Sequence, residues 1–147
     1  MPLNADRVGH SYPPYRFEVG REHVRAYAAV TGVVDGRYHD DAPDADAEGL
    51  AVPPAFVACI TGAQAWMRVM DDPELAAHDR VMHGGQELAF SAPVRVGDTL
   101  VCTPRIGDLR SLRGMELLTV GVACTRTDGT PVVTSSSRLV FMPEAGS

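Results

Sequence analysis

The chain contains no lysine, and all 13 of its cationic side chains are arginines. Reactions that need a lysine nucleophile or a lysine Schiff base are therefore excluded. With 19 acidic residues, the net charge is −6 and the isoelectric point lies near 5.2. Nucleic acid and anionic membrane surfaces attract basic proteins, so we expect neither of them as a partner.

Cysteines are also few, and the three present (Cys59, Cys102 and Cys124) lack the short paired spacing of metal sites. We therefore expect no metal and no cofactor, and we interpret the cysteines as small core residues. Their odd number, in a chain whose first residues lack an apolar signal stretch, favours reduced thiols and a cytoplasmic location. No window approaches the roughly 18 apolar residues that a membrane span requires.

The 147 residues suffice for one well-buried domain, and we expect a single domain over 1–147 with its core at about 8–142. Hydrophobic residues make up 45% of the chain, as in an ordinary globular protein. Apolar residues recur at helical spacing over 20–72 and at strand spacing over 81–142. This order places helices in the first half and a sheet in the second.

The helical half contains one segment of unusual character. Residues 55–70 are apolar on nearly every side, which is typical of a buried helix, and Pro54 and Asp72 mark the expected ends. Before it, the pattern predicts a strand over 15–19 and an amphipathic helix over 22–30. The acidic run 40–48 is expected to be a solvated loop.

Four strands are predicted after the long helix, at 81–90, 99–109, 115–125 and 131–142. Short turn sequences separate the last three of them, and Asp128-Gly129 is the strongest hairpin signal in the chain. The predicted fold is therefore of the α+β class. An antiparallel meander curves around a long central helix.

Four segments carry recognisable motifs: Thr31-Gly32 with Tyr38, Val52–Phe56, Met82–Phe90 and Pro93–Asp98. Their order resembles the MaoC-like and FAS1-like dehydratase families of hot-dog proteins, which include (R)-specific enoyl hydratases. The last two segments resemble the His-Gly-x-Gln and Arg-Pro-x-Arg-x-Gly-Asp signature of accessory dehydratase subunits. The chain departs from that signature at Ala92, where the subunits usually have arginine, and at Asp35-Gly36, where they usually have Asn-Pro.

Catalytic members of the resembling family have an Asp directly after Thr-Gly and a His five residues later. The corresponding positions here hold Val33 and Tyr38, so the resemblance implies no catalytic residue at either. Valine cannot transfer a proton, and a phenol is poorly matched to base catalysis at neutral pH. Asp35 and His39 could form a substitute pair if the loop slipped by one residue. The alternative is that Tyr38 packs under the helix while His39 lies in solvent.

The resemblance implies an accessory, non-catalytic subunit of a heterodimeric (3R)-hydroxyacyl-thioester dehydratase in fatty-acid or polyketide synthesis. Its partners would be a catalytic hot-dog subunit and an acyl thioester of acyl carrier protein or coenzyme A. Two alternatives stay open: a homodimeric acyl-thioester-binding protein without activity, and an autonomous hydratase that uses Asp35 and His39. His83 opens a glycine-containing strand and is interpreted as structural. The residues expected to line or back an acyl channel are Pro54, Ala55, Phe56, Val57, Ile60 and Trp66.

Overall fold

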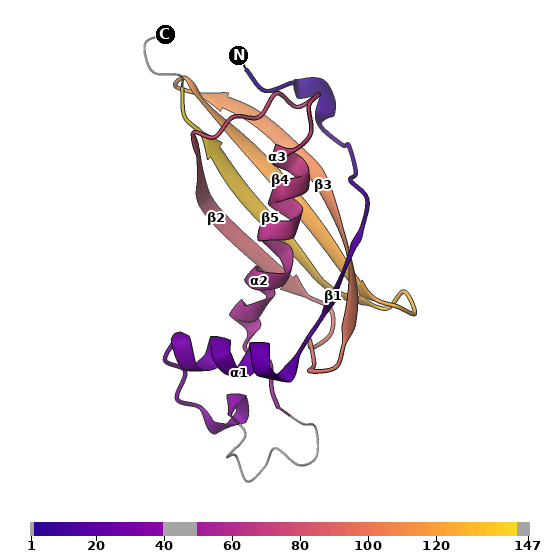
Figure 1. The fold of residues 1–147 in the computed structure, drawn as a ribbon. Helices are drawn as coiled ribbons and strands as arrows, with labels where there is room; N and C mark the ends of the chain where they lie inside the picture. Colours follow the sequence, from indigo (N-terminus) through magenta and orange to yellow (C-terminus); the bar gives the residue numbers. More distant parts are fainter. Residues whose placement is uncertain (1, 40–49, 144–147) are drawn as a thin grey trace.

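The computed structural model describes residues 2–39 and 50–143, and it places an antiparallel sheet against a central helix (Figure 1). The strands are β1 (Tyr15–Glu18), β2 (Val81–Phe90), β3 (Thr99–Leu112), β4 (Met115–Arg126) and β5 (Pro131–Phe141). The helices are α1 (Arg21–Val30), α2 (Val57–Thr61) and α3 (Ala63–Met70), with short 3-10 turns η1 (Ala5–Arg7), η2 (Gly36–Tyr38) and η3 (Pro54–Phe56). Each predicted strand is found within a few residues of its expected bounds. The acidic run 40–48 lies outside the described residues.

The sheet has the strand order β1-β3-β4-β5-β2, and all four neighbouring pairs are antiparallel. Only β3, β4 and β5 form a meander, so the prediction that all four later strands form one was wrong. β2 pairs with β5 at the far edge, because the connection over residues 91–98 crosses the end of the sheet instead of turning back tightly. As a result, β1 and β2 are the two edge strands of the sheet.

Glycines in left-handed conformations make the two tight turns of the meander. Arg113 and Gly114 have φ values of 52° and 81°, which is the twisted turn geometry that suits a two-residue hairpin. Gly129 has a φ of 89°, and the carboxylate of Asp128 accepts a hydrogen bond from Thr130 N (2.9 Å). The hairpin predicted from Asp128-Gly129 is confirmed.

The central helix begins and ends where the sequence predicted, but it is interrupted. It starts with η3 at Pro54, continues as α2, breaks at Gly62 and resumes as α3 until Met70. Gly62 has a ψ of −97°, and a Cβ atom built on it would lie 2.7 Å from Ala58 O. A glycine is therefore needed where the two helical segments meet.

Two apolar clusters fill the space between the central helix and the sheet. One gathers around Phe56 and Ile60 near α2, and the other gathers around Val69 and Phe141 near α3. Trp66 packs against both clusters and so marks the boundary between them. Figure 1 shows the helix running lengthwise over one face of the sheet, with α1 across its lower end.

The N-terminal segment is tied to the far end of this core. Asp72 is 9% exposed and accepts hydrogen bonds from the hydroxyl of Tyr12 (2.7 Å) and from Nε of Arg7 (2.9 Å). Leu3 N donates to both carboxylate oxygens of Glu116 on β4. These contacts hold residues 3–12 against the end of α3 and the sheet.

Candidate functional site

The loop after α1 carries positions 33 and 38, at which the family resemblance places the acid–base pair of catalytic members. α1 ends at Val30 and is followed by Thr31 and Gly32, whose φ of 71° is a left-handed conformation that glycine adopts without strain. Gly32 N donates to Ala29 O and Val33 N donates to Ala28 O (3.1 Å), so the turn is closed by backbone atoms. The loop continues into η2, which ends at Tyr38.

Val33 and Tyr38 are both half-buried in this loop. The guanidinium carbon of Arg37 lies 5.5 Å from the centroid of the Tyr38 ring. His39 is half-buried as well, so the alternative of a buried Tyr38 beside a solvent-exposed His39 does not describe the loop. Neither a valine side chain nor a phenol beside an arginine is suited to general base catalysis.

Asp35 and His39 each have a different partner. The Asp35 carboxylate accepts from Nη2 of Arg37 (2.6 Å) and also caps η2 through Arg37 N (3.0 Å). The hydrogen bond from the Arg37 side chain is the main cause that lowers the pKa of Asp35, which is therefore a weak base. Within residues 2–39 and 50–143, no hydrogen bond joins Asp35 to His39.

The ring of His39 is oriented by a backbone carbonyl. Its Nε2 lies 2.6 Å from Val33 O, and because a carbonyl oxygen only accepts, this nitrogen carries a proton. In the neutral ring Nδ1 is then the acceptor nitrogen. Asp40, which follows directly, lies outside the described residues. The geometry thus gives His39 a structural role in closing the loop.

The residues expected to line or back an acyl channel divide into three groups. Phe56, Val57 and Ile60 are fully buried and point into the core, where the Phe56 ring meets the Tyr27 ring edge-on at 5.5 Å. Pro54 and Ala55 are exposed at the start of the helix, and Trp66 is half-buried further along it.

An apolar hollow of about 180 Å³ opens between α3 and the edge strand β2. Trp66 forms one wall, and its ring centroid lies 4.7 Å from that of His83 on β2. His83 is exposed, as a residue at the rim of an opening would be. The lining residues are Trp66, Met70, Val81, Met82, His83 and Leu139.

A polar row lies beneath the break in the central helix, and sequence reasoning did not identify it. Gln86 Nε2 donates to Thr61 Oγ1 (3.2 Å) and to Ser135 Oγ (3.1 Å), so it joins the helix to β5. Ser137 is 1% exposed, and its hydroxyl is one of three buried side-chain polar atoms without a partner among the described residues. Nε1 of Trp66 is another. The signal in the sequence that could have indicated this polar row was the run of three serines in an apolar strand.

One side of the central helix faces solvent. Cys59 and Met67 are exposed on it, Met67 by 62%, although the apolar character of the segment predicted burial on every side. Pro54 and Gln64 are exposed as well. Four of the exposed residues follow one another at intervals of four and form one exposed stripe: Ala55, Cys59, Ala63 and Met67. Met82, 56% exposed on β2, adds to the apolar surface on the strand. The two other cysteines are buried, as expected.

In the part of the chain that the structure describes, no group of three or more His, Cys, Asp or Glu side chains could hold a metal ion. Over the same residues, no helix is long and apolar enough to cross a membrane.

Comparison with known families matches residues 6–135 to the FAS1-like dehydratase domain region. Among curated proteins, the chain is similar to the UPF0336 proteins of Streptomyces avermitilis (40% identity over 146 residues) and Streptomyces coelicolor (38% over 145). Both matches cover 95% of this chain and 95% of the relative.

Among solved structures, a chain of the C-terminally truncated HadBC complex, a (3R)-hydroxyacyl-ACP dehydratase of Mycobacterium tuberculosis, matches with a TM-score of 0.76 and 25% identity. That match covers 94% of this chain and 99% of the other. A MaoC-like dehydratase matches with a TM-score of 0.77 and 29% identity, and this chain covers 42% of its length. The α+β hot-dog fold predicted from the sequence is confirmed, and the chain belongs to the FAS1-like dehydratase domain family.

Proposed function

We propose that this chain is the accessory, non-catalytic subunit of a heterodimeric (3R)-hydroxyacyl-thioester dehydratase of fatty-acid or polyketide synthesis. The observation that carries the proposal is the presence of Val33 and Tyr38 at the two acid–base positions. The similarity to a HadBC chain over nearly the full length of both chains supports the same assignment.

The reaction explains why these two positions matter. Dehydration removes a proton from the α-carbon of the thioester and expels the β-hydroxyl as water, so a base and an acid must both be in place. Valine has no exchangeable proton and no acceptor. Asp35 is held by Arg37, and His39 is bonded to Val33 O, so neither is positioned as part of an acid–base pair.

The partner that we propose is a second hot-dog subunit that keeps the Asp–His pair. β2 is an edge strand of the sheet, and an unpaired strand edge is a ready template for another strand. The hollow between α3 and β2 is lined by Trp66 and Met70, which are close to Met67 of the exposed stripe along α3. A partner that extends the sheet at β2 would also cover the stripe, where Ala55 and Ala63 permit close approach of its helix.

The acyl chain would then pass between the two central helices. In this arrangement Ala55 lies at the interface and Trp66 borders the hollow, while Phe56, Val57 and Ile60 support the channel from the core side. Pro54 begins the helix three residues after Ala51, whose N donates to Arg37 O in the loop of Val33 and Tyr38. The chain therefore supplies channel wall, and the partner supplies the proton transfers.

The substrate carrier in this proposal is acyl carrier protein or coenzyme A, both of which are anionic. With no lysine available, arginines must supply any contact to them. Arg95, Arg105 and Arg113 are exposed, and so is Arg110, whose Nε donates to Asp108. Charged side chains of this kind raise the rate of association with an oppositely charged partner more than they raise the binding affinity.

The test compares three samples with one (3R)-hydroxyacyl thioester: this chain alone, a hot-dog chain with the Asp–His pair from an adjoining gene, and both together. We expect no turnover by this chain and full turnover only in the mixture. Losing a general acid–base group typically costs about 10²–10⁴-fold in rate.

Turnover by the lone chain that Asp35→Asn or His39→Ala abolishes would instead establish an autonomous hydratase. Asp108→Asn is the matched control, because Asp108 is also an exposed carboxylate paired with an arginine two residues on. A lone chain that forms a dimer, binds thioester and ignores the candidate partner would favour the homodimeric binding protein.

A further inference from the structure

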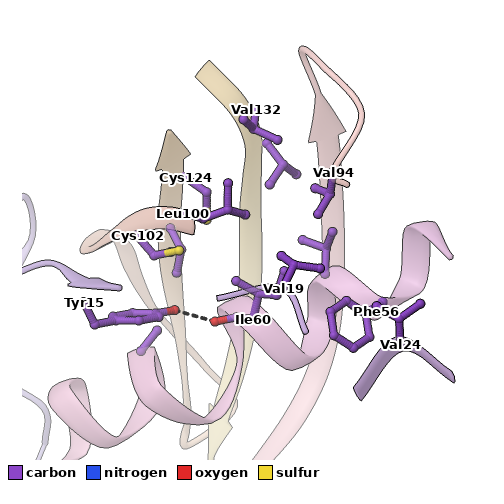
Figure 2. Close-up of a cluster of buried hydrophobic side chains, with 14 of the residues drawn as sticks. Tyr15, Val19, Val24, Phe56, Ile60, Val94, Leu100, Cys102, Cys124 and Val132 are labelled. Atoms are coloured by element: carbon purple, nitrogen blue, oxygen red, sulfur yellow. Dashed lines mark hydrogen bonds between the residues drawn. The ribbon is translucent and has the colours of Figure 1, made fainter. Parts of the chain in front are cut away.

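Two cysteines face each other across neighbouring strands in the core. Cys102 on β3 and Cys124 on β4 are register partners, and they are 0% and 2% exposed. Both side chains belong to the apolar cluster beneath α2, so they point to the same face of the sheet. Figure 2 shows them side by side near Tyr15.

The backbone hydrogen bonds identify the kind of pair that they form. Pro104 O accepts from Tyr12 N, and Ile106 N donates to His10 O, so these β3 residues direct their backbone groups toward the N-terminal segment and away from β4. The β3–β4 register is unbroken from Cys102 to Ile106, and alternate residues share this direction. Cys102 and Cys124 are therefore a non-hydrogen-bonded pair.

This geometry suits a disulfide bond. In a non-hydrogen-bonded antiparallel pair the Cα atoms lie about 4.5 Å apart. Disulfides span Cα separations of about 4.4–6.8 Å, so the two thiols can be joined without moving the strands apart or changing register. The pair lies within one meander hairpin.

The surroundings distinguish the two sulfurs. A hydrogen bond from Cys124 lowers the pKa of Cys102, while the same hydrogen bond and burial raise the pKa of Cys124. Cys102 is therefore the thiol that ionises first and attacks an oxidant. Beside it, the hydroxyl of Tyr15 donates to Ile60 O (2.6 Å), which connects the site to α2.

We propose that Cys102 and Cys124 are an oxidation site at which an internal cross-strand disulfide forms in the folded chain. Each thiol loses one proton and one electron, and an S–S bond forms between the two sulfurs. A two-electron oxidant such as a diazene or a peroxide takes up the two protons and the two electrons. A diazene is reduced to its hydrazine in this step. The site lies in the half of the core under α2, and the proposal holds whether or not the chain is a dehydratase subunit.

The disulfide would stiffen the wall of the core that faces α2. It cross-links the β3–β4 hairpin, which lowers the conformational entropy of the unfolded chain, so the oxidised protein should melt at a higher temperature. The exposed Cys59 lies on a different element and could form bonds between chains. Its removal is required before the internal pair is measured.

The experiment treats folded Cys59→Ser protein with diamide, blocks the remaining thiols and measures the intact mass and the tryptic peptides. Trypsin separates the two cysteines, because Arg105, Arg110 and Arg113 lie between them. We expect a monomer lighter by two hydrogen atoms, a linked pair of peptides containing Cys102 and Cys124, and full reversal by dithiothreitol. Cys59→Ser/Cys124→Ser is the matched control and should keep its single thiol without forming that link.

Circular dichroism before and after treatment establishes that the chain stays folded. Two thiols that remain free in the folded protein would overturn the proposal, and so would a disulfide that forms only at urea concentrations that unfold it. Adducts of the oxidant on separate cysteines, without a link between them, would also overturn it.

Discussion

The exposed stripe of the central helix gives the sharpest test of the proposed assembly, through the substitution Met67→Glu. Met67 is 62% exposed in the single chain, so most of its apolar surface is available for burial by a partner. Full burial of a methionine side chain contributes about 1.5–3 kcal/mol, and the exposed share of it corresponds to about 1–2 kcal/mol.

The glutamate also brings a charge into the interface. Burying a polar group without a partner costs about 1–3 kcal/mol in mutational data, and a carboxylate costs at least as much. The two effects together weaken the complex by about 2–5 kcal/mol, which is at least ~30-fold in the dissociation constant. Stability of the lone chain should hardly change, because the residue already lies in solvent and glutamate is a good helix former.

Sedimentation velocity of the chain mixed with its catalytic partner measures the loss of binding, and thermal melting of the chain alone measures its stability. Leu112→Glu is the matched control, since Leu112 is 51% exposed at the end of β3, with β4 and β5 between it and β2. Met67→Leu should retain binding. If Met67→Glu binds the partner as tightly as the native chain does, the helical stripe is not part of the interface.

Three further perturbations test the packing around the site. Burial raises the pKa of Asp72, but hydrogen bonds from Tyr12, the Glu74 backbone and Arg7 outweigh this effect and lower it. The stability that Asp72 contributes is therefore present above its unfolded pKa of about 3.9 and is lost as the pH falls through the folded value. Asp72→Asn should therefore lower the urea midpoint at pH 7 and flatten its decline below about pH 4, as equilibrium unfolding at several pH values will measure; an unchanged pH profile would contradict this assignment. Gly84→Ala should destabilise the chain by about 1–3 kcal/mol in urea unfolding, because the new Cβ would lie 2.7 Å from Val140 Cγ2, and Gly85→Ala, which meets nothing within 4 Å, is its control. Ser137→Ala removes a buried hydroxyl without a partner among the described residues and should leave the melting temperature unchanged or raise it, whereas a drop of several degrees would show that the hydroxyl is hydrogen-bonded in solution.

The parts of the fold that could be predicted are those determined by local patterns. Alternating apolar residues and the Asp128-Gly129 turn predicted the later strands to within a few residues, because strand register and hairpin turns are short-range properties. The pairing of β2 with β5 could not be predicted in this way, since it depends on how a connection crosses the sheet. The break at Gly62 was likewise hidden, because one glycine in an apolar segment is compatible with a continuous helix.

In the candidate site, too, local features could be predicted from the sequence and tertiary contacts could not. The composition of the central helix predicted burial but not which side would remain open, so the exposure of Cys59 and Met67 was missed. Gln86 lay within a motif that the resemblance had already marked, yet its bonds to Thr61 and Ser135 join segments distant in the sequence. Such contacts follow from the tertiary structure alone.

The loop after α1 shows how a backbone fold can form without an Asp–His pair at positions 33 and 38. Backbone bonds hold much of its shape: Val33 N donates to Ala28 O, Tyr38 N donates to Asp35 O, and Ala51 N donates to Arg37 O (2.9 Å). The Asp35 carboxylate and the His39 ring add side-chain bonds to Arg37 N and Val33 O. None of these bonds involves the side chain at either acid–base position. These backbone bonds can form whichever side chains occupy positions 33 and 38, so the proposed channel wall could be kept if the proton-transfer groups reside in a partner. In the proposed heterodimer this independence would let one hot-dog chain supply the channel wall and the other the proton transfers.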